Sequence, residues 1–122
     1  RKLPGIAVED IGACAYGIFR AGGTYAGKTV GVAGEHLTGQ EMADGLSKAL
    51  GEEVAYSYVP PEVYRTFGFP GADDLGNMFQ FNRDFSDEFC GLRDVEFSRS
   101  LHPGLQTFSA WLERNGARIP RS

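Results

Sequence analysis

Little in this sequence points to a metal site, a membrane or a nucleic acid. There are two histidines in 122 residues, His36 and His102, and neither has a second ligand at metal-binding spacing. Twelve basic residues face 16 acidic ones, for a formal net charge of -4, and no basic stripe of the kind that binds nucleic acid occurs. No apolar run reaches the roughly 18 residues of a membrane span, and the first residues lack the apolar core of a signal peptide. The composition therefore predicts a soluble, cytoplasmic protein without nucleic-acid or membrane partners.

Cysteine is scarce as well. Cys14 and Cys90 are the two in the chain, they are far apart, and Cys14 falls among apolar residues of a helical pattern. We interpret both as reduced, buried thiols rather than as a disulfide. At 122 residues the chain has the size of one domain, covering residues 1–122, and such a domain can bury roughly two-thirds of its unfolded surface.

The first half of the chain alternates helical and strand patterns. Apolar residues recur at helical spacing over Val8–Arg20, which predicts a helix. Gly12 and Gly17 inside it each cost about 1 kcal/mol relative to alanine, so we expect them to permit close packing on a neighbouring sheet. Residues 28–33 and 54–59 have the alternation and β-branched or aromatic content of strands.

The most specific local signal is the start of a helix between these two segments. Thr38 is predicted as the N-cap, and Glu41 three residues later completes a capping box. Leu37 can pack on Met42 as a hydrophobic staple. Gly51 stands at the position of a C-terminal cap.

The second half reads as mainly helical. Proline at position 61 suits the first turn of a short helix over residues 61–67, and Asp73 can cap a longer helix that carries apolar residues to Phe85. Residues 90–103 show a weak pattern and are predicted to be irregular. Residues 107–115 are predicted as a closing helix.

One segment matches the letters of a phosphate-binding P-loop. Residues 22–29, GGTYAGKT, fit G-x-x-x-x-G-K-[ST]. A P-loop needs a strand before the glycines and a helix beginning at the Lys-Ser/Thr pair, so that helix amides face the phosphates. Here a helix precedes the glycines and a strand-like run follows Lys28, so we interpret the segment as a turn without nucleotide binding.

Nothing else in the sequence makes a case for catalysis by the chain itself. A Tyr-x-x-x-Lys pair is absent: Tyr16 is followed by Arg20, and Tyr25 stands one residue too close to Lys28. No serine or cysteine has the context of a nucleophile, and two histidines make a triad hard to build. The residue pair 73–74, both aspartate, opens a helix, where carboxylates are favoured in any case. We therefore predict no catalytic, cofactor-binding or metal-binding residues.

The aromatic residues are unevenly distributed. Nine of the fifteen fall between Tyr56 and Phe89. They either form core, or some of them wall a pocket or a partner groove, since such sites are lined mainly by apolar and aromatic groups. The candidate surface for a ligand or partner comprises Tyr58, Tyr64, Phe67, Phe69, Met78, Phe79 and Phe81.

Several segments together resemble a known family. They are VEDIG at 8–12, the run at 25–64 that contains GEHLTGQE, GFPGADDLGNMF at 68–79 and TFSAWLERNG at 107–116. They look like the C-terminal part of an NmrA-like protein, an atypical member of the short-chain dehydrogenase superfamily. The resemblance implies an α/β fold, the C-terminal part of a Rossmann-like NmrA fold: helix, strand, helix, strand, then a mainly helical small domain.

The resemblance also implies where a cofactor would bind. In the family, NADP or NAD binds a glycine-rich turn after the first strand of an N-terminal half. This sequence has no G-x-x-G-x-x-G followed by a helix, so we expect no cofactor in this chain and NADP only together with that half. The family is known mainly for nucleotide-sensing regulators that bind other proteins, and many members lack the catalytic Tyr and Lys.

We therefore expect a non-catalytic C-terminal module of an NAD(P)-sensing regulator, not an enzyme in isolation, acting through a cleft or protein-binding surface. Two alternatives stay open. One is the substrate lid of an NAD(P)-dependent reductase, with a small-molecule ligand in an aromatic cleft. The other is a complete small protein that self-associates as a dimer, because so few strands leave sheet edges and helix faces uncovered.

Overall fold

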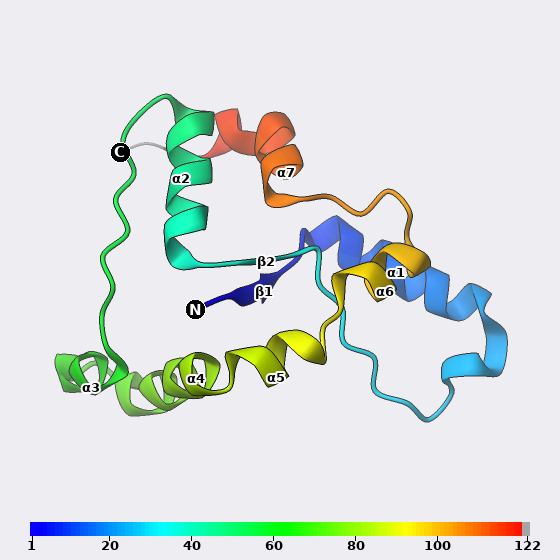
Figure 1. Cartoon of the computed structure of the whole chain (residues 1–122), viewed down its shortest axis with the longest axis horizontal. Coiled ribbons are helices and arrows are strands. Elements are labelled where there is room, and N and C mark those ends of the chain that lie inside the picture. Colours follow the sequence, from blue (N-terminus) through cyan, green and yellow to red (C-terminus); the bar gives the residue numbers. More distant parts are fainter. Residues whose placement is uncertain (121–122) are drawn as a thin grey trace.

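The chain folds as helices placed around a short two-stranded sheet. The computed structural model describes residues 1–120. Strand β1 (Leu3–Gly5) pairs antiparallel with β2 (Glu35–Leu37), with Leu3 opposite Leu37. In Figure 1 the sheet lies between a lower row of helices, an upper pair and a right-hand pair. The fold is thus mixed α/β but mostly helical, and no further strand occurs within residues 1–120.

The prediction of strands at residues 28–33 and 54–59 is wrong, because neither segment pairs with a strand within residues 1–120. Their backbone groups bond to side chains instead. The Ala33 N–H donates to Ser98 Oγ at 2.9 Å, and the Val54 N–H donates to Ser47 Oγ at 2.8 Å. Alternation makes a segment suitable for a sheet, but a strand forms only where a neighbour supplies its ladder of hydrogen bonds.

Helix α1 (Val8–Arg20) has the predicted bounds and is followed by the 3₁₀ turn η1 (Gly22–Tyr25). It packs on α6 (Val95–Leu101), so the expected sheet neighbour is wrong. A Cβ built on Gly17 would lie 2.3 Å from the Leu101 carbonyl oxygen, whereas one on Gly12 would meet nothing within 4 Å. Of these two glycines, Gly17 permits a close approach of the helices and Gly12 does not.

Helix α6 falls in the region predicted to be irregular, and that prediction is wrong. Asp94 caps the helix, since its Oδ1 accepts the Glu96 N–H at 3.1 Å. Ser98 is completely buried and bonds through its hydroxyl to both Ala33 and the Asp94 carbonyl. Its large apolar residues, Val95, Phe97 and Leu101, are spaced by two and then four positions, so the helical periodicity is weak. The polar contacts of Asp94 and Ser98 help to position the helix.

The upper pair of helices confirms the strongest local prediction. Helix α2 (Gly39–Leu50) begins with the capping box, in which Thr38 Oγ1 accepts the Glu41 N–H at 3.1 Å and Glu41 Oε1 accepts the Thr38 N–H at 2.8 Å. Gly51 ends it at a φ of 69°. It packs against α7 (Phe108–Asn115), which Thr107 caps and η3 (Gly116–Arg118) follows.

The lower row begins after the extended segment 52–60, which descends from α2 (Figure 1). It contains α3 (Pro61–Tyr64) with its continuation η2 (Arg65–Phe67), then α4 (Ala72–Asp84) and α5 (Ser86–Gly91). The N-cap of α4 is Gly71, at a φ of 90°, and not Asp73 as predicted. The Ser86 hydroxyl donates to the Lys2 carbonyl at 2.6 Å, which ties the row to β1.

The buried interior consists mostly of small side chains. Both cysteines are free and buried, as predicted. The other buried apolar residues are Ala33, Ala43, Ala72, Leu105 and Leu112. Large apolar side chains, in contrast, are often exposed, with Val8 at 80% and Phe19 at 79% on α1. Exposed apolar surface of this extent marks sites of interaction. None of the helices within residues 1–120 combines the length and apolar character that crossing a membrane requires.

Candidate functional site

A hollow of about 690 Å³ lies where the start of α2, the extended segment before α3, and helices α3 and α4 meet. We call it the aromatic cleft. Its apolar walls are formed mainly by rings and completed by four aliphatic residues and by polar groups from α2 and α4. The lining residues are Arg1, Lys2, Leu3, Thr38, Gly39, Gln40, Met42, Tyr56, Tyr58, Val59, Pro61, Tyr64, Phe67, Phe79, Asn82 and Arg83.

Tyr64 is the centre of the ring cluster. Its ring centroid lies 5.1 Å from that of Phe79 on α4, 5.5 Å from Phe67 and 5.6 Å from Phe69. The contacts with Phe79 and Phe69 are edge-on, a geometry that aromatic pairs favour because the ring edge is positive and the face negative. The rings therefore hold one another in place and give the cleft a fixed wall.

Tyr56 lines the cleft next to the first turn of α2. A Cβ built on Gly39 would lie 2.3 to 2.7 Å from three atoms of the Tyr56 ring. The ring thus rests directly on the backbone at Gly39, and any larger residue there would displace it. The tyrosine itself is 40% exposed, so its other face is open to the cleft.

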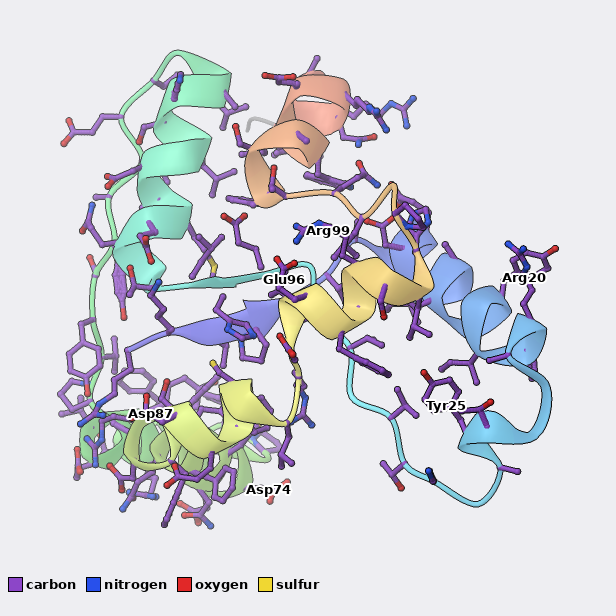
Figure 2. All side chains as sticks on the ribbon, turned by 45° about the vertical axis from the view of Figure 1, so that its right-hand side comes forward. Arg20, Tyr25, Asp74, Asp87, Glu96 and Arg99 are labelled. Atoms are coloured by element: carbon purple, nitrogen blue, oxygen red, sulfur yellow. The ribbon has the colours of Figure 1, made fainter. Side chains whose placement is uncertain are left out.

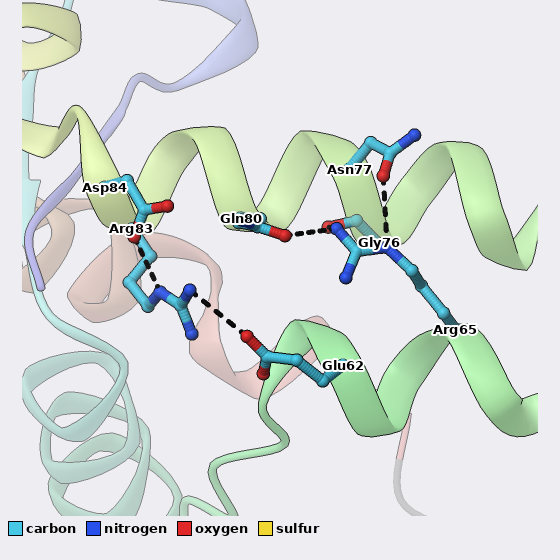
Figure 3. Close-up of polar contacts among 7 residues, drawn as sticks. All are labelled: Glu62, Arg65, Gly76, Asn77, Gln80, Arg83 and Asp84. Carbon is cyan, nitrogen blue, oxygen red and sulfur yellow. Dashed lines mark hydrogen bonds and ion pairs between the residues drawn. The ribbon is translucent and has the colours of Figure 1, made fainter.

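Arg83 contributes a cation to the lining of the cleft, and Figure 3 shows its contacts with Glu62 and Asp84. Its Nε lies 2.9 Å from Asp84 Oδ1 and its Nη2 lies 3.3 Å from Glu62 Oε1 on α3. The Asp84 carboxylate, followed by the Tyr58 hydroxyl, raises the pKa of Arg83 above its usual value. The guanidinium is therefore permanently charged and oriented by α3 and α4 together.

Arg65 fixes the position of η2 relative to α4 (Figure 3). Its Nε donates to Asn77 Oδ1 at 3.0 Å, and its Nη2 donates to Gln80 Oε1. Gly76 lies beneath the side chain, since a Cβ there would be 2.6 Å from Arg65 Cγ. These contacts hold the two helices that carry Tyr64 and Phe79 at a fixed spacing.

The seven predicted surface residues divide into two groups. The structure brings Tyr58, Tyr64, Phe67 and Phe79 together in the cleft. The remaining three do not line it: Phe69 packs on Tyr64 from outside, Met78 is 45% exposed, and Phe81 stacks on Phe85 at 5.0 Å.

The sequence analysis missed Tyr56 and Arg83 as members of this site. Arg83 was accessible to prediction, because it follows Phe79 by four residues and so shares its helix face. Phe81, two residues from Phe79, points to nearly the opposite face for the same reason. Tyr56 was also accessible to prediction, because it stands two residues before Tyr58 in a segment whose residues were expected to alternate between two faces.

Other predicted features lie outside the cleft. The P-loop-like segment forms η1 and an extended run, and α1 precedes it as expected. Asp74 lies on the outer side of the lower row, and Glu96 pairs with Arg99 within α6 (Figure 2). Within residues 1–120, no three His, Cys, Asp or Glu side chains are grouped to hold a metal ion.

The chemistry of the cleft is that of a binding surface. Its charged lining residues, Arg1, Lys2 and Arg83, are all basic, and its walls are aromatic. Compared with models of known protein families, the sequence matches that of the NmrA-like family over residues 1–112. The matched range includes every residue that lines the cleft.

Proposed function

Because the chain belongs to the NmrA-like family, we propose that it is a non-catalytic C-terminal module of an NAD(P)-sensing regulator and that it binds a partner protein through the aromatic cleft. The observation that carries this proposal is the cleft itself, a hollow lined by five aromatic rings and three basic residues. Aromatic residues and arginine are the types enriched where binding energy concentrates in protein interfaces.

The lining also suggests the chemistry of the partner segment. Ring faces at Tyr56, Tyr64 and Phe79 suit an aromatic or aliphatic anchor side chain. Arg83 keeps Asp84 and Glu62 as partners. A guanidinium has five N–H donors, however, and can donate to a further carboxylate. A segment with an apolar anchor next to an acidic residue therefore fits best.

The proposal is tested by panning a library of random peptides displayed on phage against the chain and measuring the affinity of the selected peptides by fluorescence polarisation. We expect enriched peptides to combine an apolar anchor with an acidic residue. Phe79→Ala should weaken their binding at least about tenfold, the cost of losing a central anchor. Arg83→Gln should weaken the binding of acidic peptides more than the binding of analogues in which the carboxylate is replaced by an amide.

Phe81→Ala is the matched control, because it removes the same side chain from the same helix, α4, at a similar exposure, 50% against 40% for Phe79. Equal affinity of both variants, each folded by circular dichroism, would show that peptides bind elsewhere. A library without enrichment would count against a protein-binding cleft.

A second function, the substrate lid of an NAD(P)-dependent reductase, is favoured by the size of the cleft. Its volume of 690 Å³ falls within the roughly 300–1,000 Å³ that small-molecule sites occupy. The discriminating observation is genetic: a Tyr-x-x-x-Lys pair together with a glycine fingerprint encoded upstream in the same reading frame would support the reductase. Phe79→Ala would then raise the substrate KM of the whole protein.

Self-association is the remaining candidate, favoured by the outer face of α1. Val8, Ile11, Tyr16 and Phe19 share that face and are 47 to 80% exposed. Two α1 helices packed antiparallel would bury these side chains and bring Glu9 of one copy near Arg20 of the other. Sedimentation velocity tests this, since a folded monomer at about 100 μM would exclude a stable dimer of micromolar affinity.

A further inference from the structure

A second hollow, of about 390 Å³, lies on the other side of Leu3 and Met42 from the aromatic cleft. We call it the α7 pocket. It is enclosed by β1, β2, the starts of α1 and α2, and the first turn of α7. Its lining is mainly apolar: Leu3, Gly5, Ile6, Ala7, Val8, Glu9, Glu35, Leu37, Met42, Gln106, Thr107, Phe108 and Trp111.

Gln106 orients one of the carboxylates that line the pocket. Its amide nitrogen donates to Glu9 Oε1 at 3.1 Å and to Asp10 Oδ1 at 3.4 Å. Because carboxylates can only accept, these two bonds fix which end of the amide is nitrogen. The other end, Oε1, is buried and has no donor within the described residues. Because this oxygen is buried, a ligand in the hollow does not reach it, and Gln106 contributes to the pocket by orienting the Glu9 carboxylate.

The charge of the lining has a single sign. Glu9 and Glu35 are acidic, and among residues 1–120 no Lys, Arg or His lines the pocket. Glu35 Oε1 also accepts the Phe108 N–H at 2.9 Å. The Gln106 hydrogen bond lowers the pKa of Glu9, so that carboxylate is ionised at neutral pH. Two nearby basic side chains are not among the lining residues: His102 Nε2 lies 3.2 Å from Asp10 Oδ1, and the charge of Arg114 helps to lower the pKa of Glu9.

We propose that the α7 pocket binds a small apolar amine, whose ammonium group lies beside the carboxylates of Glu9 and Glu35 while its hydrocarbon part packs against Phe108 and Trp111. The volume of the pocket, about 390 Å³, exceeds that of a six-carbon amine. It is close to the lower end of the roughly 300–1,000 Å³ that small-molecule sites occupy. An apolar pocket with a few converging polar groups is the usual form of such a site, and here all of these groups favour a donor or a cation.

The test uses n-hexylamine as probe and the single tryptophan of the chain, Trp111, as reporter. Because Trp111 lines the pocket, we expect a saturable change of its fluorescence. Hexanoate and 1-hexanol share the hydrocarbon chain, so they control for apolar binding alone. We expect hexanoate to bind at least tenfold more weakly than n-hexylamine and hexanol to fall between them.

Variants locate the site. Glu9→Gln keeps the size of the side chain and removes its charge. It should therefore lower the affinity for n-hexylamine about threefold or more and leave the affinity for 1-hexanol unchanged. Leu37→Phe should fill the pocket and weaken both probes. Phe79→Ala in the aromatic cleft is the matched control and should leave the titration unchanged, which separates this proposal from the proposed partner binding.

The proposal is overturned if hexanoate binds as well as n-hexylamine, or if Glu9→Gln leaves the amine affinity unchanged. Glu9 is exposed, so this variant is expected to fold. A variant at Glu35 is less suitable, because that side chain also bonds the start of α7.

Discussion

The close contact between Gly17 and α6 predicts that Gly17→Ala destabilises the folded protein. A methyl group at this position would lie 2.3 Å from the Leu101 carbonyl oxygen and 3.1 Å from the Leu101 Cβ, whereas ordinary contacts begin at 3.4 Å. The obstructing oxygen belongs to backbone, so no rotamer change can relieve the clash. Gly17→Ala must therefore separate α1 from α6 by about 1 Å.

Two opposing effects decide how much Gly17→Ala changes the free energy of unfolding. Alanine stabilises a helix interior by about 1 kcal/mol relative to glycine. Overpacking a close contact costs typically about 1–3 kcal/mol, and a rigid backbone obstacle places this site near the upper end. We expect Gly17→Ala to lower the free energy of unfolding by about 2 kcal/mol, which is the overpacking cost of about 3 kcal/mol less the gain of about 1 kcal/mol from alanine.

Gly12→Ala is the matched control, because it makes the same substitution in the same helix where a Cβ meets nothing within 4 Å. It should raise the free energy of unfolding by up to about 1 kcal/mol. Urea titration followed by far-UV circular dichroism measures both variants. The reasoning would be refuted if Gly17→Ala were as stable as Gly12→Ala, because the helices would then not be in close contact.

Three further predictions concern the cap, the thiol and the cofactor. Hydrogen bonding from Thr38, mainly its N–H, lowers the pKa of Glu41 below the usual 4.5, so this contribution to stability is present above pH 4.5 and is lost as the pH falls through the lowered pKa. The urea midpoint of Glu41→Gln should accordingly fall less on acidification than that of the unmodified chain; equal falls would contradict the role of the carboxylate. Burial raises the pKa of Cys14, so iodoacetamide should alkylate it in urea but hardly in native buffer, and rapid native labelling found at Cys14 by mass spectrometry would show that α1 and α6 open readily. NADPH at micromolar concentration should give no saturable signal with the 122-residue chain, and a binding isotherm would overturn the expectation that the chain carries no cofactor site.

The aromatic cleft shows how far a pattern of residue types reaches. The concentration of rings between Tyr56 and Phe89 indicated a surface in this region, and four of seven named residues do line one hollow. Phe81 does not line this hollow, although it is only two residues from Phe79 in the sequence. On a helix, positions two apart diverge by about 200°, so Phe79 and Phe81 cannot share a cleft.

The sequence alone determined the features that depend on neighbours along the chain. The capping box at Thr38, the left-handed end of α2 at Gly51 and the extent of α1 follow from side chains a few residues apart, and all three occur in the structure. The NmrA-like family was also evident from the sequence, because its motifs are local strings of residues.

Tertiary structure decided what depends on partners distant in the chain. Residues 28–33 have the composition of a strand, yet Ala33 bonds to Ser98, 65 residues away, and no neighbouring strand pairs with them within residues 1–120. Gly17 faces a helix rather than a sheet, and Tyr56 enters the cleft because Gly39 leaves room for its ring. Propensity describes what a segment can do, but hydrogen-bond pairing and close packing depend on which segments meet.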